Sequence, residues 1–109
     1  MNQNTNEEYY IVAAKIISNV GTAKSLVLEA LNVAKKGNFE VAEEKIEESK
    51  RYFVEGHKMH ASLVQREASG EQLNFSLMLM HAEDQLMNAE TISLLVKEMI
   101  EIYRSSNAK

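Results

Sequence analysis

The chain has 109 residues, of which 45% are hydrophobic, and this is sufficient for one packed domain. Its formal net charge is −4, and the basic residues form no stripe that would bind the phosphates of a nucleic acid. There is no uninterrupted apolar run of about 18 residues and no positive, apolar leader, so we expect a cytoplasmic protein without membrane insertion. The absence of cysteine excludes disulfides, thiolate metal sites and thiol nucleophiles.

Two glycines divide the chain into three long segments that are rich in Ala, Leu, Glu, Lys and Met, and proline is absent. These glycines stand at positions 37 and 70, and the segments predict helices over about 7–36, 39–69 and 75–104. Because the connections are short, consecutive helices must run antiparallel. We therefore predict an all-α fold, an up-down-up antiparallel three-helix bundle that forms one domain over residues 1–109.

Residues that commonly cap helices stand before each predicted segment. Thr5 and Glu8 have the form of a capping box at the start of the first helix. Asn38 can cap the second helix, and either Asn74 or Ser76 can cap the third. These residues support the three predicted helix starts to within a few positions.

The second and third segments differ in how many apolar stripes they carry. Segment 39–69 has one stripe, formed by Phe39, Ala42, Ile46, Ser49, Phe53, Gly56, His60 and Leu63. Segment 75–104 has a first stripe formed by Leu79, Ala82, Leu86, Ala89, Ser93, Val96, Ile100 and Tyr103. Its second stripe contains His81, Gln85, Asn88, Ile92, Leu95, Met99 and Ile102. Two stripes need two partners, so we expect the second to face other copies of the chain, unless this helix is simply the central one of the bundle.

The second stripe is polar in its first half and apolar in its second half. His81 stands in the polar half between Met80 and Ala82. A neutral imidazole is a competent nucleophile near neutral pH and can accept a phosphoryl group. The alternative is that His81 is a packed or solvent-facing residue without reactivity, and the spacing alone does not separate these interpretations.

Asp84 shares this side of the helix with His81. If the stripe is the axis of a symmetric trimer, three copies of the carboxylate converge and repel one another. A hard divalent cation such as Mg²⁺ would turn this repulsion into a cross-link between subunits. Alternatively, Asp84 is a surface residue that is hydrogen-bonded to His81 or to a neighbouring chain.

Two further histidines lie three positions apart in the second segment. His57 and His60 are not accompanied by Glu-x-x-His pairs or by a His-Glu-x-x-His motif, so metal catalysis is not indicated. His60 fits the apolar stripe of its helix as a packed residue. His57 can line the groove beside the third helix.

Three blocks of the sequence resemble the enzyme IIA component of the lactose and cellobiose (diacetylchitobiose) branch of the sugar phosphotransferase system. They are GTAKSLVLEALNVAKKGNFEVA over 21–42, HKMHASLVQREASGE over 57–71 and MHAEDQLM over 80–87. The resemblance implies that His81 carries phosphate during uptake of a β-linked disaccharide. The donor would be the histidine-containing phosphocarrier protein, and the acceptor would be a cysteine of the enzyme IIB component.

The resemblance also implies an assembly and the surroundings of the phosphate. It predicts a homotrimer of three-helix subunits in which Asp84 meets its symmetry mates around a metal ion, for which we expect Mg²⁺. It further places His57 beside the phosphoryl group. The apolar residues near His81 would form a surface on which both protein partners dock; they are Leu77, Leu79, Met80 and Met87.

The chain departs from the family pattern at three positions. The pattern usually has glutamine where this chain has Glu83, histidine where it has Gln85, and glutamine where it has His60. A carboxylate at position 83 would oppose a dianionic phosphoryl group unless the side chain turns outward. These departures leave two other hypotheses open, a non-catalytic helical interaction or regulatory module on the same scaffold and a standalone metal-binding bundle.

Overall fold

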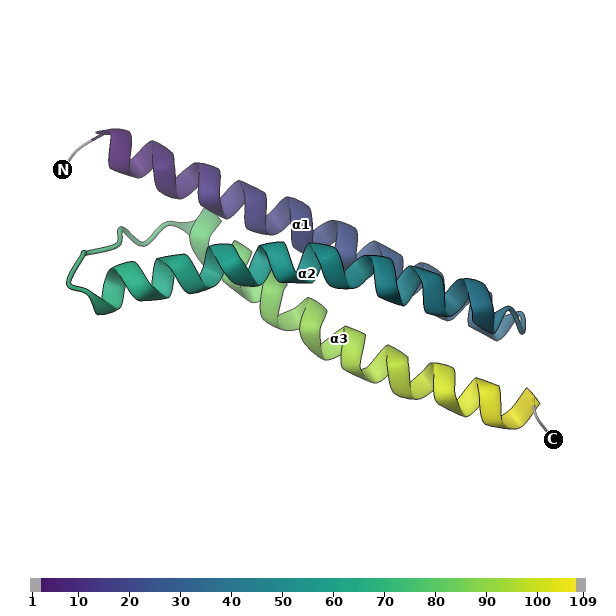
Figure 1. The fold of residues 1–109 in the computed structure, drawn as a ribbon. Coiled ribbons are helices and arrows are strands. Elements are labelled where there is room, and N and C mark those ends of the chain that lie inside the picture. The colour runs from purple at the N-terminus through teal and green to yellow at the C-terminus, as the bar shows by residue number, and fades with distance from the viewer. Residues whose placement is uncertain (1–2, 108–109) are drawn as a thin grey trace.

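The computed structural model describes residues 3–107, with side chains from Glu7 onward, and contains three helices (Figure 1). They are α1 (Gln3–Lys35), α2 (Phe39–Ala68) and α3 (Leu77–Asn107). No strand occurs within residues 3–107. The helices run up, down and up, so the predicted all-α architecture is confirmed. Their ends differ from the predicted ones by about four residues at most.

Two of the predicted caps are present. The side-chain oxygen of Asn38 accepts a hydrogen bond from the backbone N–H of Val41 at 3.3 Å. The hydroxyl oxygen of Ser76 accepts one from the N–H of Leu79 at 3.0 Å, so Ser76, two positions after Asn74, supplies the cap of α3. Both contacts satisfy backbone donors that a helix start leaves without an intrahelical partner.

The predicted capping box at the start of α1 is wrong. The helix begins at Gln3, so the backbone of Thr5 is already helical, and its side chain lies outside the described part of the structure. Glu8 instead forms an ion pair with Arg66 of α2. Glu8, which the local sequence pattern assigned to the cap of α1, is thus paired with a residue of another helix.

Gly37 and Gly70 end the first two helices in the same way. Their φ angles of +87° and +104° lie in the left-handed region, which side chains with a Cβ rarely adopt. After each glycine, the next N–H bonds back to a carbonyl five residues earlier, from Asn38 to Val33 at 2.9 Å and from Glu71 to Arg66 at 3.1 Å. This is the Schellman arrangement, and it reverses the chain sharply at both turns.

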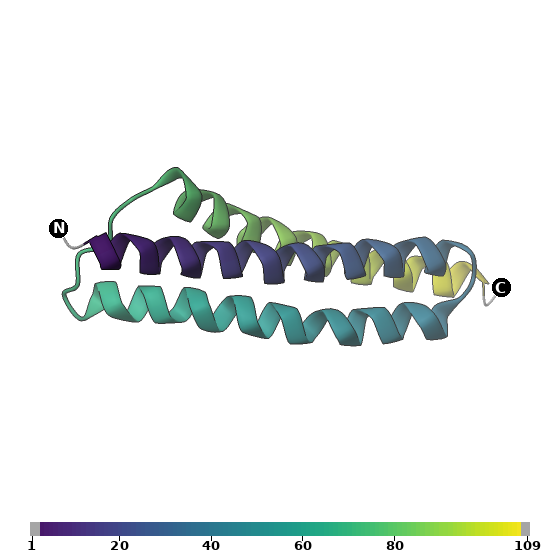
Figure 2. The same cartoon turned by 90° about the horizontal axis from the view of Figure 1, so that it is seen from above.

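The first helix is the centre of the bundle. It packs along both α2 and α3, which have few contacts with each other, and Figure 2 shows α1 between them. Its buried side chains recur at steps of three and four, at Tyr9, Ala13, Ile16, Val20, Ala23, Val27, Ala30 and Ala34. The alternative that the third helix is the central one is therefore wrong.

This central position also explains the composition of α1. Among the described residues, one helical segment, Glu7–Lys35, is long and apolar enough to cross a membrane by length and composition. The same composition is expected of a core helix that contacts two others. The segment contains no uninterrupted apolar run of that length, because Lys15, Lys24 and Glu29 divide it.

The first stripe of α3 forms its buried face. All of its predicted members are buried except Tyr103, which is 38% exposed near the end of the helix. On α2, the predicted residues are either buried or half-buried. The hydrophobic periods of both helices therefore identified the faces that pack against α1.

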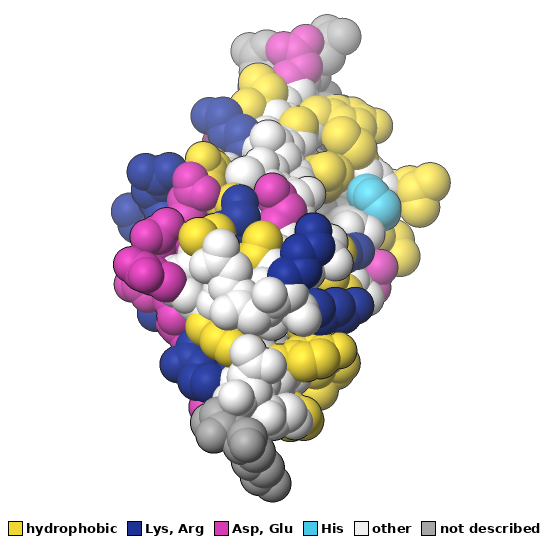
Figure 3. Space-filling model, turned by 90° about the vertical axis from the view of Figure 1, so that its right-hand side faces the viewer, with side chains coloured by type: hydrophobic (Ala, Val, Ile, Leu, Met, Phe, Trp, Pro, Cys, Tyr) yellow, Lys and Arg dark blue, Asp and Glu magenta, His cyan; other side chains and the backbone are white. Residues whose placement is uncertain are grey.

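The second stripe of α3 is not covered within one chain. Leu95, Met99 and Ile102 are 54%, 43% and 65% exposed, and Ile92 is half-buried. Figure 3 shows hydrophobic side chains gathered along one side of the molecule, whereas acidic and basic side chains dominate the other. An apolar helix face of this length is unusual on a monomeric protein.

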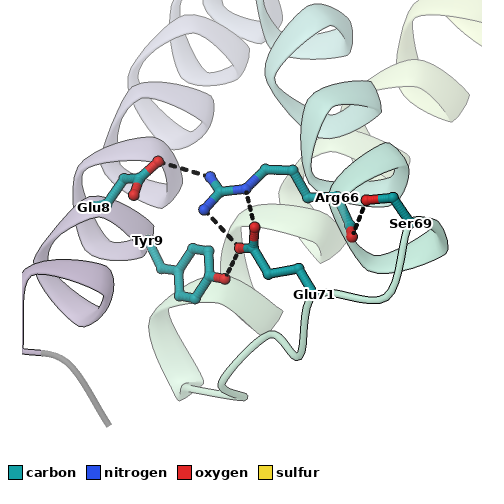
Figure 4. A network of polar contacts seen from close by, with 5 residues as sticks. All are labelled: Glu8, Tyr9, Arg66, Ser69 and Glu71. Carbon is teal, nitrogen blue, oxygen red and sulfur yellow. Dashed lines mark hydrogen bonds and ion pairs between the residues drawn. The ribbon is translucent and has the colours of Figure 1, made fainter.

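A polar network ties α1 and α2 to the loop before α3 (Figure 4). The Nη1 atom of Arg66 lies 2.8 Å from a carboxylate oxygen of Glu8, and Nη2 lies 2.6 Å from one of Glu71. The guanidinium also stacks over the ring of Tyr9, with Cζ 5.0 Å from the ring centroid. The buried Tyr9 donates its hydroxyl hydrogen to Glu71. The network fixes the start of the connection that leads into α3.

These contacts change the acidity of their members. The hydrogen bonds from Arg66 and then from Tyr9 lower the pKa of Glu71, because they stabilise its carboxylate form. The same hydrogen bond to Glu71, together with burial, raises the pKa of Tyr9. The network is therefore most favourable when Glu71 is ionised and Tyr9 is protonated.

We predict that Glu71→Gln makes the free energy of unfolding less dependent on pH in the acidic range. Because the pKa of Glu71 is lower in the folded chain than its ordinary value of 4.5, its contribution is present above about pH 4.5. That contribution is lost as the pH falls through the folded-state pKa. The difference in urea midpoint between wild type and Glu71→Gln should be largest near neutral pH and shrink in acid. A difference that is the same at all pH values would contradict this role.

Candidate functional site

His81 lies one turn into α3 and is exposed to solvent. Among the described residues, its ring has no hydrogen-bond or ion-pair partner. The next residue, Ala82, is fully buried against the core, so the backbone that carries the ring is held by packing. The interpretation of His81 as a packed residue is therefore wrong, and its ring nitrogens are accessible from solution.

Exposed apolar side chains surround this part of α3. Leu77 is 83% exposed, Met80 is 57% exposed and Met87 is 69% exposed, and Phe75 in the preceding loop is 84% exposed. Leu79 is different, because it is only 6% exposed and belongs to the core cluster under α3. Its predicted place in the docking surface is thus corrected, since it belongs to the first stripe and faces α1.

Asp84 is also exposed and has no hydrogen-bond or ion-pair partner among the described residues. The predicted alternative of a hydrogen bond to His81 is therefore absent within one chain. No group of three or more His, Cys, Asp or Glu residues in the described part of the chain is arranged to hold a metal ion. A metal at Asp84 would accordingly need ligands from other copies of the chain.

His57 lies in the groove between α2 and α3, as one of the sequence interpretations expected. Its Nε2 atom is 3.1 Å from a carboxylate oxygen of Glu90. The groove has a volume of about 350 Å³, and Phe53, Val54 and Leu94 contribute its apolar lining. Glu90 follows His81 by nine residues, or about two and a half turns, and so faces the opposite side of α3. Within one chain, the structure does not bring His57 to His81.

His60 and Glu83 form a close pair that the sequence analysis missed. The Nδ1 atom of His60 lies 2.6 Å and 2.7 Å from the two carboxylate oxygens of Glu83. The carboxylate is thus directed toward α2 and away from the second stripe. Both residues depart from the family pattern, and this coincidence was the one signal that could have suggested their contact.

The site therefore combines an accessible imidazole with little fixed structure around it. His81 and Asp84 occupy the outer side of α3, whereas Glu83 and Glu90 face the histidines of α2. His81 itself lies exposed on the surface of α3. This arrangement suits transfer between proteins better than retention of a small substrate.

Comparison with known proteins identifies the family to which the chain belongs. Residues 11–104 match the family described as "PTS system, Lactose/Cellobiose specific IIA subunit". The PTS system lactose-specific EIIA component of Streptococcus mutans is 37% identical over 98 residues, which cover 90% of this chain and 94% of that protein. The lichenan-specific phosphotransferase enzyme IIA component of Bacillus subtilis is 36% identical over 98 residues, covering 90% of this chain and 89% of that protein.

A solved structure shows the same fold. The crystal structure of the PTS cellobiose-specific enzyme IIA from Bacillus anthracis matches with a TM-score of 0.90 and 36% sequence identity. The match covers 100% of this chain and 96% of that chain. The resemblance drawn from the three sequence blocks is thereby confirmed. The chain belongs to the lactose/cellobiose-specific IIA family of the sugar phosphotransferase system and is a sugar-specific IIA component.

Proposed function

We propose that this chain is a phosphocarrier that uses His81 as its phosphate acceptor during uptake of a β-linked disaccharide. The donor is the histidine-containing phosphocarrier protein, and the acceptor is a cysteine of the enzyme IIB component. The observation that carries the proposal is the exposed imidazole of His81, without a partner, in the sequence block that most resembles the family. The cytoplasm is the expected compartment, since the soluble phosphocarrier protein must reach the site.

The chemistry consists of two displacements at phosphorus. A ring nitrogen of His81 attacks the phosphoryl group of the donor, so the donor's P–N bond breaks as a new P–N bond forms. The thiolate of enzyme IIB then attacks the same phosphorus, and the phosphoryl group leaves the imidazole. Neither step requires this chain to supply an acid: the second nitrogen of each phosphorylated ring keeps its proton, so the ring departs as a neutral imidazole when its P–N bond breaks.

The exposed apolar surface around His81 supports docking of both partners. Leu77, Met80 and Met87 provide apolar contact area close to the reactive ring. Methionine side chains are unbranched and adapt to different shapes, so one surface can fit two different proteins in turn. Because the ring is exposed and has no polar partner among the described residues, the partners must supply many of the hydrogen-bond donors to the phosphoryl oxygens.

The second stripe of α3 supports a homotrimer. From His81 to Ile102 the stripe advances at alternating steps of four and three residues, which is the period of a coiled-coil seam. Its apolar second half is exposed in one chain, and burying it between copies would remove this surface from water. His81 lies at the polar end of the seam, where partners can still approach it.

A metal ion fits this assembly, although it does not fit one chain. Asp84 supplies one carboxylate per chain, and three copies around an axis would provide the oxygen ligands that Mg²⁺ prefers, completed by water. The ion would neutralise three converging carboxylates. Asp84 would then hold subunits together and has no direct part in the transfer.

We predict that His81→Ala abolishes phosphate acceptance without unfolding the chain. The ring is exposed and has no polar partner, so its loss should change the free energy of unfolding by only about 0.5 kcal/mol. Incubation with the general phosphotransfer proteins and labelled phosphoenolpyruvate should label wild type and leave the variant unlabelled. Labelling of a folded His81→Ala variant would reject the assignment. A wild-type chain without label would instead support the non-catalytic module.

We predict that Leu95→Glu dissociates the trimer, because it places three carboxylates in the apolar half of the seam. Sedimentation equilibrium should show wild type as a trimer and this variant as a folded monomer. Leu94→Glu is the matched control, since Leu94 is 65% exposed but lines the groove between α2 and α3. A trimeric Leu95→Glu variant would place the interface elsewhere.

We predict that a chelator lowers the thermal stability of the wild-type trimer and has little effect on Asp84→Asn. The asparagine variant lacks the converging charges, so it no longer needs a cation to neutralise them. Thermal unfolding with EDTA, and again after Mg²⁺ is restored, measures the difference. Equal sensitivity of both proteins to EDTA would exclude Asp84 as the metal ligand.

A further inference from the structure

Ion pairs between side chains connect α2 and α3 at several points along their length. Three such pairs connect the two helices, which otherwise have few contacts: His60 with Glu83, His57 with Glu90, and Arg104 with Glu43. In each pair that includes a histidine, the acidic residue belongs to α3. The His60–Glu83 pair lies closest to His81 in the sequence of α3, only two residues away.

The geometry of this pair fixes the direction of the Glu83 carboxylate. One nitrogen of His60 lies within 2.7 Å of both carboxylate oxygens, so its N–H is shared between them. The two side chains are about one third exposed, at 38% and 32%. No other described cationic side chain contacts Glu83, and the neighbouring charged residue on the adjoining surface, Glu67, is acidic. His60 is therefore the group that directs this carboxylate.

The direction is significant for a phosphate on His81. Residues two apart on a helix point about 200° apart, so Glu83 bound to α2 lies across the helix from the reactive ring. A flexible glutamate without this partner can extend around the helix and bring its charge nearer to the ring. A phosphoryl group carries about two negative charges, and a carboxylate about 10 Å away in water disfavours it by about fourfold at low salt.

We propose that His60 is a positioning residue for phosphotransfer, which acts by holding the carboxylate of Glu83 against α2. This inference rests on the proposed function of His81. His60 itself does not contact the reacting atoms. The two departures from the family pattern thus compensate each other.

The test is a comparison of four proteins, namely wild type, His60→Ala, Glu83→Gln and the double variant. Each is mixed with a fixed excess of phosphorylated phosphocarrier protein, and the fraction phosphorylated on His81 is measured at equilibrium. At low salt we expect His60→Ala to favour phosphate less than wild type, by about fourfold at most, which is the full effect of a carboxylate at that distance. High salt should remove most of this difference, since it screens exposed charges. The double variant and Glu83→Gln should both match or exceed wild type.

A control separates this effect from general loosening of the helix pair. Arg104 lies 23 residues beyond His81 on α3, about 35 Å away at 1.5 Å per residue. Arg104→Ala breaks its ion pair with Glu43 of α2. It should leave the phosphorylated fraction unchanged. Circular dichroism of every variant establishes that each is folded, and Glu83→Gln provides a measurement that does not depend on replacing His60.

The outcomes are distinguishable. Wild type that accepts no phosphate would overturn the proposed function itself. Wild-type behaviour of His60→Ala at low salt would overturn only the role of His60. A loss that persists in the double variant and at high salt would show that His60 is merely structural, and a loss in Glu83→Gln would show that the carboxylate assists the reaction.

Discussion

The packing of α1 against both other helices is the constraint on which the structure depends. Side chains of α1 are buried along its length, whereas α2 and α3 have few contacts with each other. Each outer helix therefore needs only one apolar stripe to join the bundle. The rest of α3 is left available, and that helix carries an exposed imidazole, an acidic residue and an apolar seam on its outer side. A bundle with α3 at its centre would have buried His81.

The hydrophobic periodicity of the sequence and its capping residues predict much of the fold and part of the site. Steps of three and four residues identified the buried face of α3, and Asn38 and Ser76 marked two helix starts because capping is local. The cap role given to Glu8 was wrong, because Glu8 bonds to Arg66, 58 residues away. The pairing of His60 with Glu83 was missed for the same reason. Periodicity shows which side of a helix a residue occupies, but the register between two helices decides which residues meet.

The resemblance to the family and the geometry contribute different information. The MHAEDQLM block singled out His81, and the structure adds that this ring is exposed and that Leu79 beside it is not. The resemblance placed His57 near the phosphate, whereas the single chain places it in another groove, paired with Glu90. In a trimer, a residue of one subunit can approach a site on its neighbour, so a contact of this kind would arise only on assembly.

A phosphocarrier has requirements that differ from those of an enzyme that holds its substrate. Its phosphohistidine must survive between two encounters and then be given up, so tight coordination of the phosphate by the carrier would oppose the second transfer. An exposed ring with few fixed polar neighbours meets this requirement, provided that no nearby charge opposes the phosphate. The chain carries such a charge at Glu83, and the fold directs it toward α2. On the proposed role of His81, the same scaffold that leaves its ring accessible would also determine which acidic neighbours a phosphate there meets.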